Sequence, residues 1–336
     1  MNFQKIQPIP NAKQMLDVAF RQAIEKATHK KFKGERLQIY KQQEVMKLDL
    51  IKEYLIARLE QIVNTFPHTE ELPQFYQKLM NLTIDVPAYK KSLGALTWAL
   101  GKMRGLHRNY VQGIRQTKEW DRVKEFTHEF YGRISSFLKQ VKVNLEYLEE
   151  CRKVMKNNYP DIKELPTVCL YGFPNVGKTT LLNKLTGTRA EVAAYAFTTK
   201  SINAGYLKIG EKRTIQILDV PGTLAREEKY NNIELQADLV LEELANLIVF
   251  VFDLTESSGY SLEKQEQLLK RLQKKEKKVI IYVSKRDMLD EEQLKGFHHK
   301  YYSFEEIKEL ILQFFQAENF FGEYSFIVAK VWNKGI

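Results

Sequence analysis

The stretch Gly172-Phe-Pro-Asn-Val-Gly177-Lys178-Thr179 decides the fold of the second half of this 336-residue chain. It fits the pattern GxxxxGK followed by Ser or Thr, in which glycines let backbone N–H groups turn onto phosphate oxygens. An apolar run at 168–171 precedes it, and a segment with helical character follows at 180–185. A phosphate-binding loop requires this order of strand, loop and helix. We therefore predict a nucleotide site that begins at Gly172.

The polar side chains of this loop and of two downstream segments have expected roles. Lys178 would reach the β- and γ-phosphates. Asp219-Val-Pro-Gly222 follows a second apolar run, so that Asp219 would hold Mg²⁺ through a water and the Gly222 amide would sense the γ-phosphate. Thr199 is our first choice, and Thr198 the second, for the threonine that completes the Mg²⁺ shell. The predicted catalytic residues are Lys178, Thr199 and Gly222, and the predicted Mg²⁺ ligands are Thr179, Thr199 and Asp219.

Base recognition departs from the usual guanine motif NKxD. After the apolar run that ends at Val283, the chain reads Ser284-Lys285-Arg286-Asp287. Asp287 can accept hydrogen bonds from the N1–H and N2–H₂ donors of guanine, which adenine does not offer, and Lys285 can pack its stem over the base. Ser284 replaces the usual Asn, so one hydrogen bond to the base or the loop is lost or rearranged. Guanine is predicted, with an ATPase as the alternative.

The closing motif of the base pocket would be Val328-Ala329-Lys330. The positions after Gly222 are Thr and Leu, so no glutamine is placed to orient the attacking water. This predicts slow hydrolysis that is helped by a partner or by K⁺ bound at Asn175. The full set of predicted nucleotide-binding residues is Gly172, Phe173, Pro174, Asn175, Val176, Gly177, Lys178, Thr179, Thr180, Asp219, Gly222, Ser284, Lys285, Asp287, Ala329 and Lys330.

The chain divides into two halves with different patterns. Apolar residues recur at helical spacing over 37–62 and 120–148, with breaks near Pro67 and Pro87, which predicts a helical bundle. From about residue 158, strand-like runs alternate with helical ones, which predicts a mostly parallel sheet covered by helices. The fold class is α plus α/β, with a helical domain at 1–164 and a GTPase domain at 165–336. The expected strands are 167–171, 205–209, 214–218, 247–252, 279–283 and 324–328, and the expected helices are 179–185, 235–245, 262–273 and 305–315.

The excess positive charge lies in the first half. The chain has 52 Lys plus Arg and 42 Asp plus Glu, a net charge of +10. Counted over residues 1–165, 29 basic and 19 acidic residues give +10, so the remaining 23 and 23 cancel. A basic module beside a neutral one indicates that the first half meets a polyanion, and a solvated basic surface is the alternative. The candidate RNA contacts are Lys26, Lys30, Lys31, Lys33 and Arg36, and then Lys102, Arg104, Arg108, Arg115 and Lys118, with Tyr110 nearby.

Composition excludes several classes of protein. An apolar fraction of 44% with 28% charged residues is that of a globular protein. Two cysteines are too few for a disulfide framework or a four-ligand zinc site, which favours a cytoplasmic setting. No membrane segment or signal peptide is expected, and nothing in the sequence demands more than a monomer.

Several motifs extend beyond the phosphate loop. They are AYAFTTKS at 194–201, NIELQ at 232–236, DLTESSGYS at 253–261, NLEYLE at 144–149 and NFQKIQPIP at 2–10. Together they resemble the nucleolar GTP-binding proteins of the Obg-related GTPases. The resemblance implies a helical bundle, a GTPase domain, and a role in assembling the large ribosomal subunit from rRNA and ribosomal proteins. Nucleolar members continue past the GTPase domain, so this chain looks like a short, archaeal-like form (nucleolar if it comes from a eukaryote).

Three functions are consistent with these features. The first is a GTP-driven switch that binds precursors of the large ribosomal subunit and leaves after hydrolysis to GDP. The second keeps the hydrolase and changes the base to adenine, on the ground of Ser284. The third is a ribosome-binding scaffold that holds nucleotide with negligible turnover, on the ground of the missing glutamine.

Overall fold

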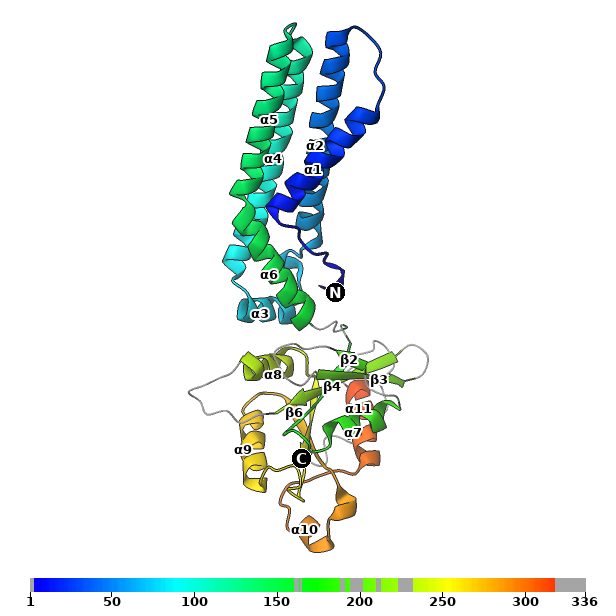
Figure 1. Cartoon of the computed structure of the whole chain (residues 1–336). Helices are drawn as coiled ribbons and strands as arrows, with labels where there is room; N and C mark the ends of the chain where they lie inside the picture. The colour runs from blue at the N-terminus through cyan, green and yellow to red at the C-terminus, as the bar shows by residue number, and fades with distance from the viewer. Residues whose placement is uncertain are drawn as a thin grey trace. The chain divides into compact units, whose positions relative to one another are not determined.

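The computed structural model describes residues 3–159, 163, 165–187, 191–193, 202–209, 213–222 and 232–317. Its chain forms two compact units (Figure 1). The helical unit combines Asn2–Leu72 with Thr83–Lys156, and the nucleotide unit combines Pro73–Leu82 with Asn157–Ile336. In the described residues, no helix is both long enough and apolar enough to cross a membrane.

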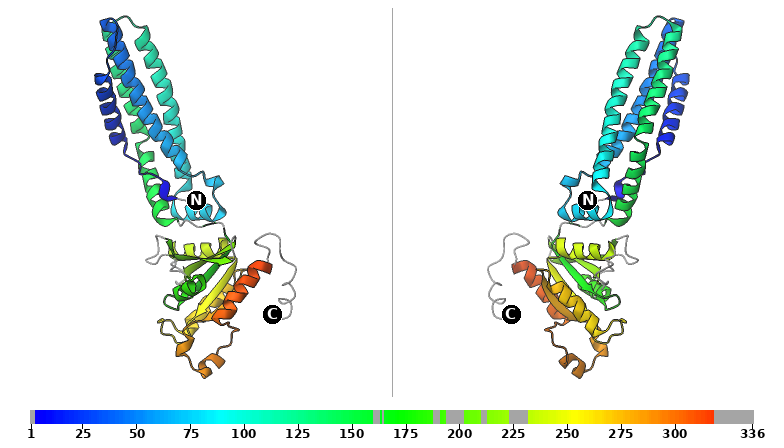
Figure 2. Two further views of the ribbon diagram at one scale, coloured as in Figure 1. Left: turned by 90° about the vertical axis from the view of Figure 1, so that its right-hand side faces the viewer. Right: turned by 90° about the vertical axis from the view of Figure 1, so that its left-hand side faces the viewer.

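The helical unit is built from long helices that pack side by side (Figure 2). They are α1 (Ala12–His29), α2 (Arg36–Thr65), α4 (Val86–Gln116), α5 (Trp120–Gln140) and α6 (Lys142–Asn158), with short 3-10 turns at Phe3–Lys5 and Thr69–Glu71. Helix α2 packs against both α1 and α4, and α4 packs against α5. Leu48, Leu55 and Leu59 of α2 and Phe130 of α5 are fully buried between them. The predicted helical bundle is therefore confirmed.

Two local signals mark the start of α4. Asp85 caps α4 by accepting a hydrogen bond from the Ala88 amide at 3.0 Å, and Pro87 lies in the first turn, where its missing N–H costs nothing. The apolar run at 120–148 continues through two helices, because the chain leaves helical geometry at Val141, which has φ −95° and ψ 9°. The periodicity therefore marks the buried face and gives no sign of the break.

The nucleotide unit contains a six-stranded sheet in the order β2-β3-β4-β1-β5-β6. Its strands are β1 (Thr167–Gly172), β2 (Glu191–Ala193), β3 (Ile202–Ile209), β4 (Arg213–Pro221), β5 (Leu247–Phe252) and β6 (Lys278–Val283). Strands β4, β1, β5 and β6 are parallel, whereas β3 runs antiparallel to β4 and β2 antiparallel to β3. All six residues of β1 and of β5 are buried, as expected for central parallel strands.

Helices cover this sheet on two sides. Figure 1 shows α8 (Asn232–Glu243) and α9 (Leu262–Gln273) on one side of the strands, with α7 (Lys178–Thr186) and α11 (Phe304–Ala317) on the other. This confirms the predicted mostly parallel sheet with helical layers. Strand β2 and the short α10 (Glu291–Lys295) were not predicted, and α3 (Gln74–Thr83) groups with this unit. The strand expected at 324–328 lies outside the described residues.

Candidate functional site

The loop between β1 and α7 has the backbone that its glycines allow. Gly172 has φ 151° and Gly177 has φ 100°, and Asn175 also lies in the left-handed region at φ 63°. A Cβ at Gly172 would lie 2.7 Å from the carbonyl oxygen of Val251, so a side chain does not fit there. The loop therefore follows a path that only this spacing of glycines permits.

Lys178 opens α7 and points back into the loop. Its ammonium group donates hydrogen bonds to the carbonyl oxygens of Gly172 at 2.9 Å and Phe173 at 2.8 Å. The side chain is only 6% exposed, and its Nζ lies 4.0 Å from Oδ1 of Asp219. A positive charge is thus held inside the turn, where the sequence predicts phosphates.

Thr179 and Asp219 come from separate motifs and meet in space. The Thr179 hydroxyl donates to Oδ2 of Asp219 at 2.5 Å. Strand pairing causes this meeting, because β1 runs beside β4 with Leu170 opposite Asp219. The side-chain NH₂ group of Asn203 in β3 also donates to Oδ2 of Asp219, at 3.3 Å. This contact forms because Asn203 lies opposite Asp219 in the antiparallel pair of β3 and β4. Sequence reasoning missed Asn203, because nothing in the sequence gave the register of β3.

The residues present fit a magnesium ion. Mg²⁺ prefers oxygen ligands and keeps several waters or substrate oxygens, and Thr179 and Asp219 offer a hydroxyl and a carboxylate that is 7% exposed. In the described part of the chain, no group of three His, Cys, Asp or Glu could hold a metal ion. The chain alone therefore gives a partial shell of the kind completed by phosphate oxygens and water.

Gly222 links the second motif to the phosphate loop. Its amide donates to the Gly172 carbonyl oxygen at 2.9 Å. A Cβ at Gly222 would lie 2.7 Å from Leu268 and 3.0 Å from that same carbonyl oxygen. Glycine is therefore required at this position for the two loops to approach so closely.

Ser284 lies between the base motif and the phosphate loop. Its amide and its hydroxyl both donate to the carbonyl oxygen of Phe252 at 2.9 Å. A Cβ at Gly177 would lie 3.3 Å from the Ser284 Cβ, so Ser284 packs against the phosphate loop. The hydrogen bond expected from an Asn at this position is replaced by one to strand β5.

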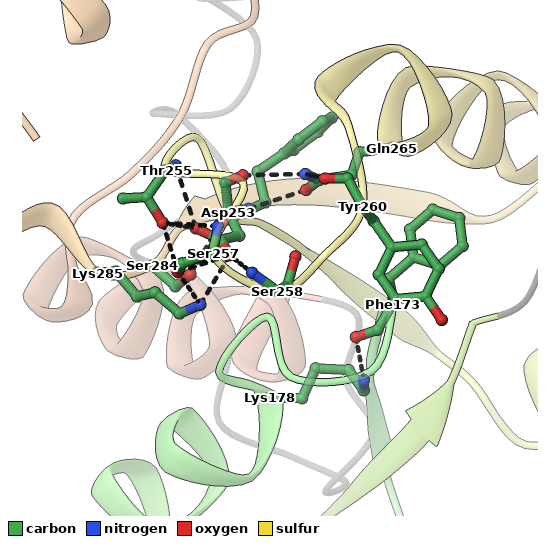
Figure 3. A network of polar contacts seen from close by, with 11 residues as sticks. Phe173, Lys178, Asp253, Thr255, Ser257, Ser258, Tyr260, Gln265, Ser284 and Lys285 are labelled. Carbon is green, nitrogen blue, oxygen red and sulfur yellow. Dashed lines mark hydrogen bonds and ion pairs between the residues drawn. The ribbon is translucent and has the colours of Figure 1, made fainter. Parts of the chain in front are cut away.

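A buried carboxylate, Asp253, organises the base side of the site (Figure 3). It follows β5 directly and is 0% exposed. One carboxylate oxygen accepts from the Thr255 amide at 3.1 Å and its hydroxyl at 2.5 Å, and the other accepts from the Ser258 amide at 2.9 Å. Lys285 Nζ lies 2.7 Å from the second oxygen and donates to Ser257 Oγ at 2.8 Å. The ammonium group of the base motif is therefore held by this loop.

Two further contacts fix the loop around Asp253. The Gln265 side chain accepts from the Asp253 amide at 2.9 Å and donates to the Asp253 carbonyl at 2.9 Å and the Tyr260 carbonyl at 3.1 Å. The Tyr260 ring stacks on Phe173 of the phosphate loop, with centroids 4.2 Å apart and planes 15° apart. Figure 3 shows this stack beside the Lys178 side chain. The phosphate and base sides of the site are thus joined through packed side chains.

The pKa of Asp253 lies below its ordinary value. Burial raises this pKa, but hydrogen bonds from Lys285, Thr255 and the Ser258 amide stabilise the charged form and outweigh burial. The carboxylate is therefore ionised at neutral pH. A signal for Asp253 exists in the sequence, since an Asp that ends a fully apolar strand and precedes Thr and Ser suits a capped turn.

The remaining predicted residues have the following places. Asn175, Thr179 and Thr180 are exposed, Phe173 and Val176 are buried, Pro174 is half-buried, and Asp287 is exposed in the 3-10 turn Arg286–Met288. Within the described residues, Asp287 makes no side-chain hydrogen bond, which leaves its carboxylate available. The predicted residues that lie outside the described part of the chain are Thr198, Thr199, Ala329 and Lys330.

The predicted RNA contacts are exposed, but they have different neighbours. Arg104, Arg108 and Arg115 line one hollow of about 950 Å³ between α2 and α4, where Arg104 pairs with Glu60. The other exposed candidates are Lys26, Lys30, Lys31, Lys33, Arg36, Lys102 and Lys118. Tyr110 is buried instead, and its hydroxyl donates to Glu129 at 2.8 Å, so it belongs to the packing of the unit.

Comparison with known proteins matches both halves of the chain. Residues 3–162 match the NOG1 N-terminal helical domain, and residues 167–285 match the 50S ribosome-binding GTPase family. An uncharacterized protein of Methanocaldococcus jannaschii is 39% identical over 251 residues, which cover 74% of this chain and 70% of that protein. Nucleolar GTP-binding protein 1 of Drosophila melanogaster is 32% identical over 300 residues, which cover 87% of this chain.

The chain spans 45% of the length of that Drosophila protein. Among solved structures, a putative nucleolar GTP-binding protein 1 of Plasmodium falciparum aligns at 21% identity with a TM-score of 0.37, covering 48% of this chain and 91% of that one. The family of the chain follows from the two domain matches and the sequence identities. Since its halves match that helical domain and that GTPase domain in order, the chain belongs to the NOG1 family of GTP-binding proteins.

Proposed function

We propose that this protein is a GTP-driven switch in the assembly of the large ribosomal subunit. It binds precursor particles through the basic helical unit while GTP is bound, and it leaves after hydrolysis to GDP. The observation that supports this most directly is the meeting of Thr179 and Asp219 at 2.5 Å, beside the buried ammonium group of Lys178. A phosphate loop with this partner carboxylate suits Mg²⁺-dependent binding of a nucleoside triphosphate.

Each residue of the site has a proposed part in hydrolysis. Lys178 neutralises charge on the β- and γ-phosphates, and Thr179 and Asp219 hold Mg²⁺, with Thr199 completing its shell. When bound, Mg²⁺ supplies positive charge where negative charge builds up on the γ-phosphate. The Gly222 amide turns from the Gly172 carbonyl toward the γ-phosphate, which couples the second motif to the state of the nucleotide.

We propose that intrinsic turnover is slow and that K⁺ raises it. No glutamine follows Gly222 to orient the attacking water. Asn175 is exposed on the phosphate loop in a left-handed conformation. No hydrogen bond to its side chain is made by the described residues, so we propose that its side-chain oxygen takes the monovalent cation. Steady-state hydrolysis measured in K⁺ and in Na⁺, with wild type and Asn175→Ala, tests this. Equal rates in the two salts would rule out the cation.

Guanine is the proposed base, read by the exposed carboxylate of Asp287. The Ser284 hydroxyl is bonded to strand β5, which removes one usual contact and keeps an ATPase as the second candidate. Affinities for GDP and ADP, measured side by side, decide between the two bases. The variant Asp287→Asn should shift preference toward xanthine nucleotides if Asp287 reads guanine.

Co-sedimentation with large-subunit particles tests the proposed function as a whole. The nucleotide conditions are a non-hydrolysable GTP analogue, a non-hydrolysable ATP analogue, GDP and no nucleotide, with Lys178→Ala as the control. Binding that needs the GTP analogue and weakens with salt supports the proposed assembly switch. Absence of binding under every condition would leave a GTPase whose ribosomal partner is wrongly assigned.

A further inference from the structure

Two basic segments that are far apart in the sequence lie together in the helical unit. Lys30 follows α1, and Arg115 lies near the end of α4, yet both line one hollow of about 630 Å³. Lys41 of α2 lines the same hollow and donates to the Arg115 carbonyl oxygen at 3.1 Å. The start of α2 and the end of α4 therefore meet at one end of the helical unit. We call this place the basic end, made of residues 30–41 and 115–121.

An exposed tryptophan lies at the basic end. Trp120 begins α5 and stacks on Tyr40 of α2, with centroids 4.2 Å apart and planes 6° apart. Although Tyr40 covers one side of its ring, Trp120 remains 48% exposed. The stack holds the indole in place, so the side that Tyr40 does not cover is presented to solvent as a rigid flat surface.

The charge of the basic end favours an anion. Its seven basic residues are Lys30, Lys31, Lys33, Arg36, Lys41, Arg115 and Lys118, and its three acidic residues are Glu35, Glu119 and Asp121, a difference of +4. Asp49, which lines the hollow from α2, lowers this difference to +3. In the neighbouring hollow between α2 and α4 the charges are closer to balance, since Arg104 pairs with Glu60. That hollow is lined by the basic residues Lys52, Arg104, Arg108 and Arg115 and by the acidic residues Asp49, Glu53 and Glu60, a difference of +1. Within the described residues, the larger excess of basic side chains therefore lies at the basic end, which also holds the Tyr40–Trp120 stack.

We propose that the basic end binds unpaired RNA, with one base stacked on Trp120 and the backbone phosphates on Lys30, Lys41 and Arg115. The combination fits single strands because stacking on an aromatic ring needs a base that is not already stacked in a duplex. The phosphate contacts place the strand, and the indole captures the base. This inference rests on the proposed RNA-binding function of the helical unit, and it names the surface and the kind of RNA.

Fluorescence anisotropy of the 336-residue chain with labelled oligonucleotides tests the proposal. The probes are a short unpaired RNA of mixed sequence and a blunt-ended RNA duplex without loops or overhangs, with the same total number of nucleotides. The variants are Trp120→Ala and Trp120→Phe, with Trp98→Ala as the matched control. Trp98 is 42% exposed and meets Phe137 edge-on, so its removal deletes an exposed indole outside the basic end.

We expect Trp120→Ala to weaken binding of the unpaired RNA by about 5- to 150-fold, the range for removing one base stack. Binding of the duplex should change little, Trp120→Phe should keep most of the affinity, and Trp98→Ala should bind like wild type. The double variant Lys30→Gln with Arg115→Gln should weaken binding of both RNAs and flatten the salt dependence, because fewer counterions are released. Circular dichroism of each variant verifies the helices.

Three outcomes would overturn the inference. If Trp120→Ala binds like wild type while the charge variant loses affinity, RNA binding stands and the stacking surface is wrong. If Trp98→Ala loses as much affinity as Trp120→Ala, the site is not at the basic end. If the wild-type chain binds neither RNA, the inference fails together with the proposed RNA-binding function.

Discussion

Replacing Asp253 by Asn tests whether the buried ion pair holds the base side of the site in place. One carboxylate oxygen faces Lys285 Nζ and the Ser258 amide, and the other faces the amide and hydroxyl of Thr255. Both oxygens thus receive N–H donors. An Asn side chain has one oxygen and one NH₂ group, so in either orientation its nitrogen meets a donor.

The expected cost is about 3 kcal/mol in the free energy of unfolding of the nucleotide unit. Removing one partner of a buried ion pair costs about 3–5 kcal/mol, because the other charge is left uncompensated. The lower end of this range applies, since the Lys285 side chain is 25% exposed and water can reach its ammonium group. GDP affinity should fall as well, because Lys285 loses the group that positions it in the base motif.

Urea unfolding followed by circular dichroism, together with binding of fluorescent GDP, measures both effects. Lys285→Met keeps the stem and removes the charge, so the double variant completes a cycle. The two substitutions together should cost less than the sum of each alone, with a coupling of about 0.5–3 kcal/mol for groups in contact. A stability for Asp253→Asn within about 0.5 kcal/mol of wild type, the range of ordinary surface substitutions, would refute the reasoning.

The same variant has a pH signature. The pKa of Asp253 is lowered from the ordinary value of 3.8, so the folded state binds its proton less tightly than the unfolded state does. The contribution of the Asp253 carboxylate to stability is therefore complete when the pH is above the ordinary pKa. It is lost as the pH falls through the lower pKa of the folded state. The free energy of unfolding should fall less steeply with decreasing pH for Asp253→Asn than for wild type across this acidic range. Parallel curves would show that the carboxylate is not the group responsible.

Four further variants test packing and hydrogen bonding. Gly222→Ala should lower the free energy of unfolding by about 1–3 kcal/mol because its Cβ is too close to three atoms. Gly132→Ala, whose Cβ meets nothing within 4 Å in α5, should raise stability by up to about 1 kcal/mol, and urea unfolding compares the two. Tyr110→Phe removes the hydroxyl that donates to Glu129, so it should cost about 1 kcal/mol and leave RNA affinity unchanged in anisotropy. Ser284→Ala should cost about 1 kcal/mol and leave GDP affinity intact; a tenfold weaker affinity would place its hydroxyl on the base.

Local patterns in the sequence predicted the parts of the fold that depend on neighbouring residues. The order of strand, glycine loop and helix predicted β1 and α7, and apolar periodicity predicted the buried faces of the long helices. The periodicity could not place the break at Val141, because the buried residues of α5 and α6 follow one stripe through it. The same periodicity does indicate that Tyr110 is buried, because Tyr110 lies four residues after the buried Leu106 on the same face of α4.

The candidate site depends on contacts that no local pattern contains. Asn203 reaches Asp219 only because β3 runs antiparallel beside β4. Strand β2, which pairs on the other side of β3, has only three residues, too few to be predicted from a sequence pattern. Lys285 was expected to lie over the base, and its ammonium group is held by Asp253, which is 32 residues earlier in the chain. Register between strands and the capping of a distant loop are tertiary features, so sequence spacing alone could not give them.

The carbonyl oxygen of Gly172 is where the two phosphate-site motifs are joined. It accepts from Lys178 Nζ and from the Gly222 amide, each at 2.9 Å, and a carbonyl oxygen has two lone pairs to offer. A bound phosphate can draw the Lys178 ammonium group away from this carbonyl oxygen. The Gly222 amide is then the one of the two donors that remains. If the Gly222 amide turns to a γ-phosphate, it loses its hydrogen bond to the Gly172 carbonyl oxygen. Hydrogen exchange at the Gly222 amide should therefore differ between the GDP-bound and GTP-bound chain, because its acceptor changes.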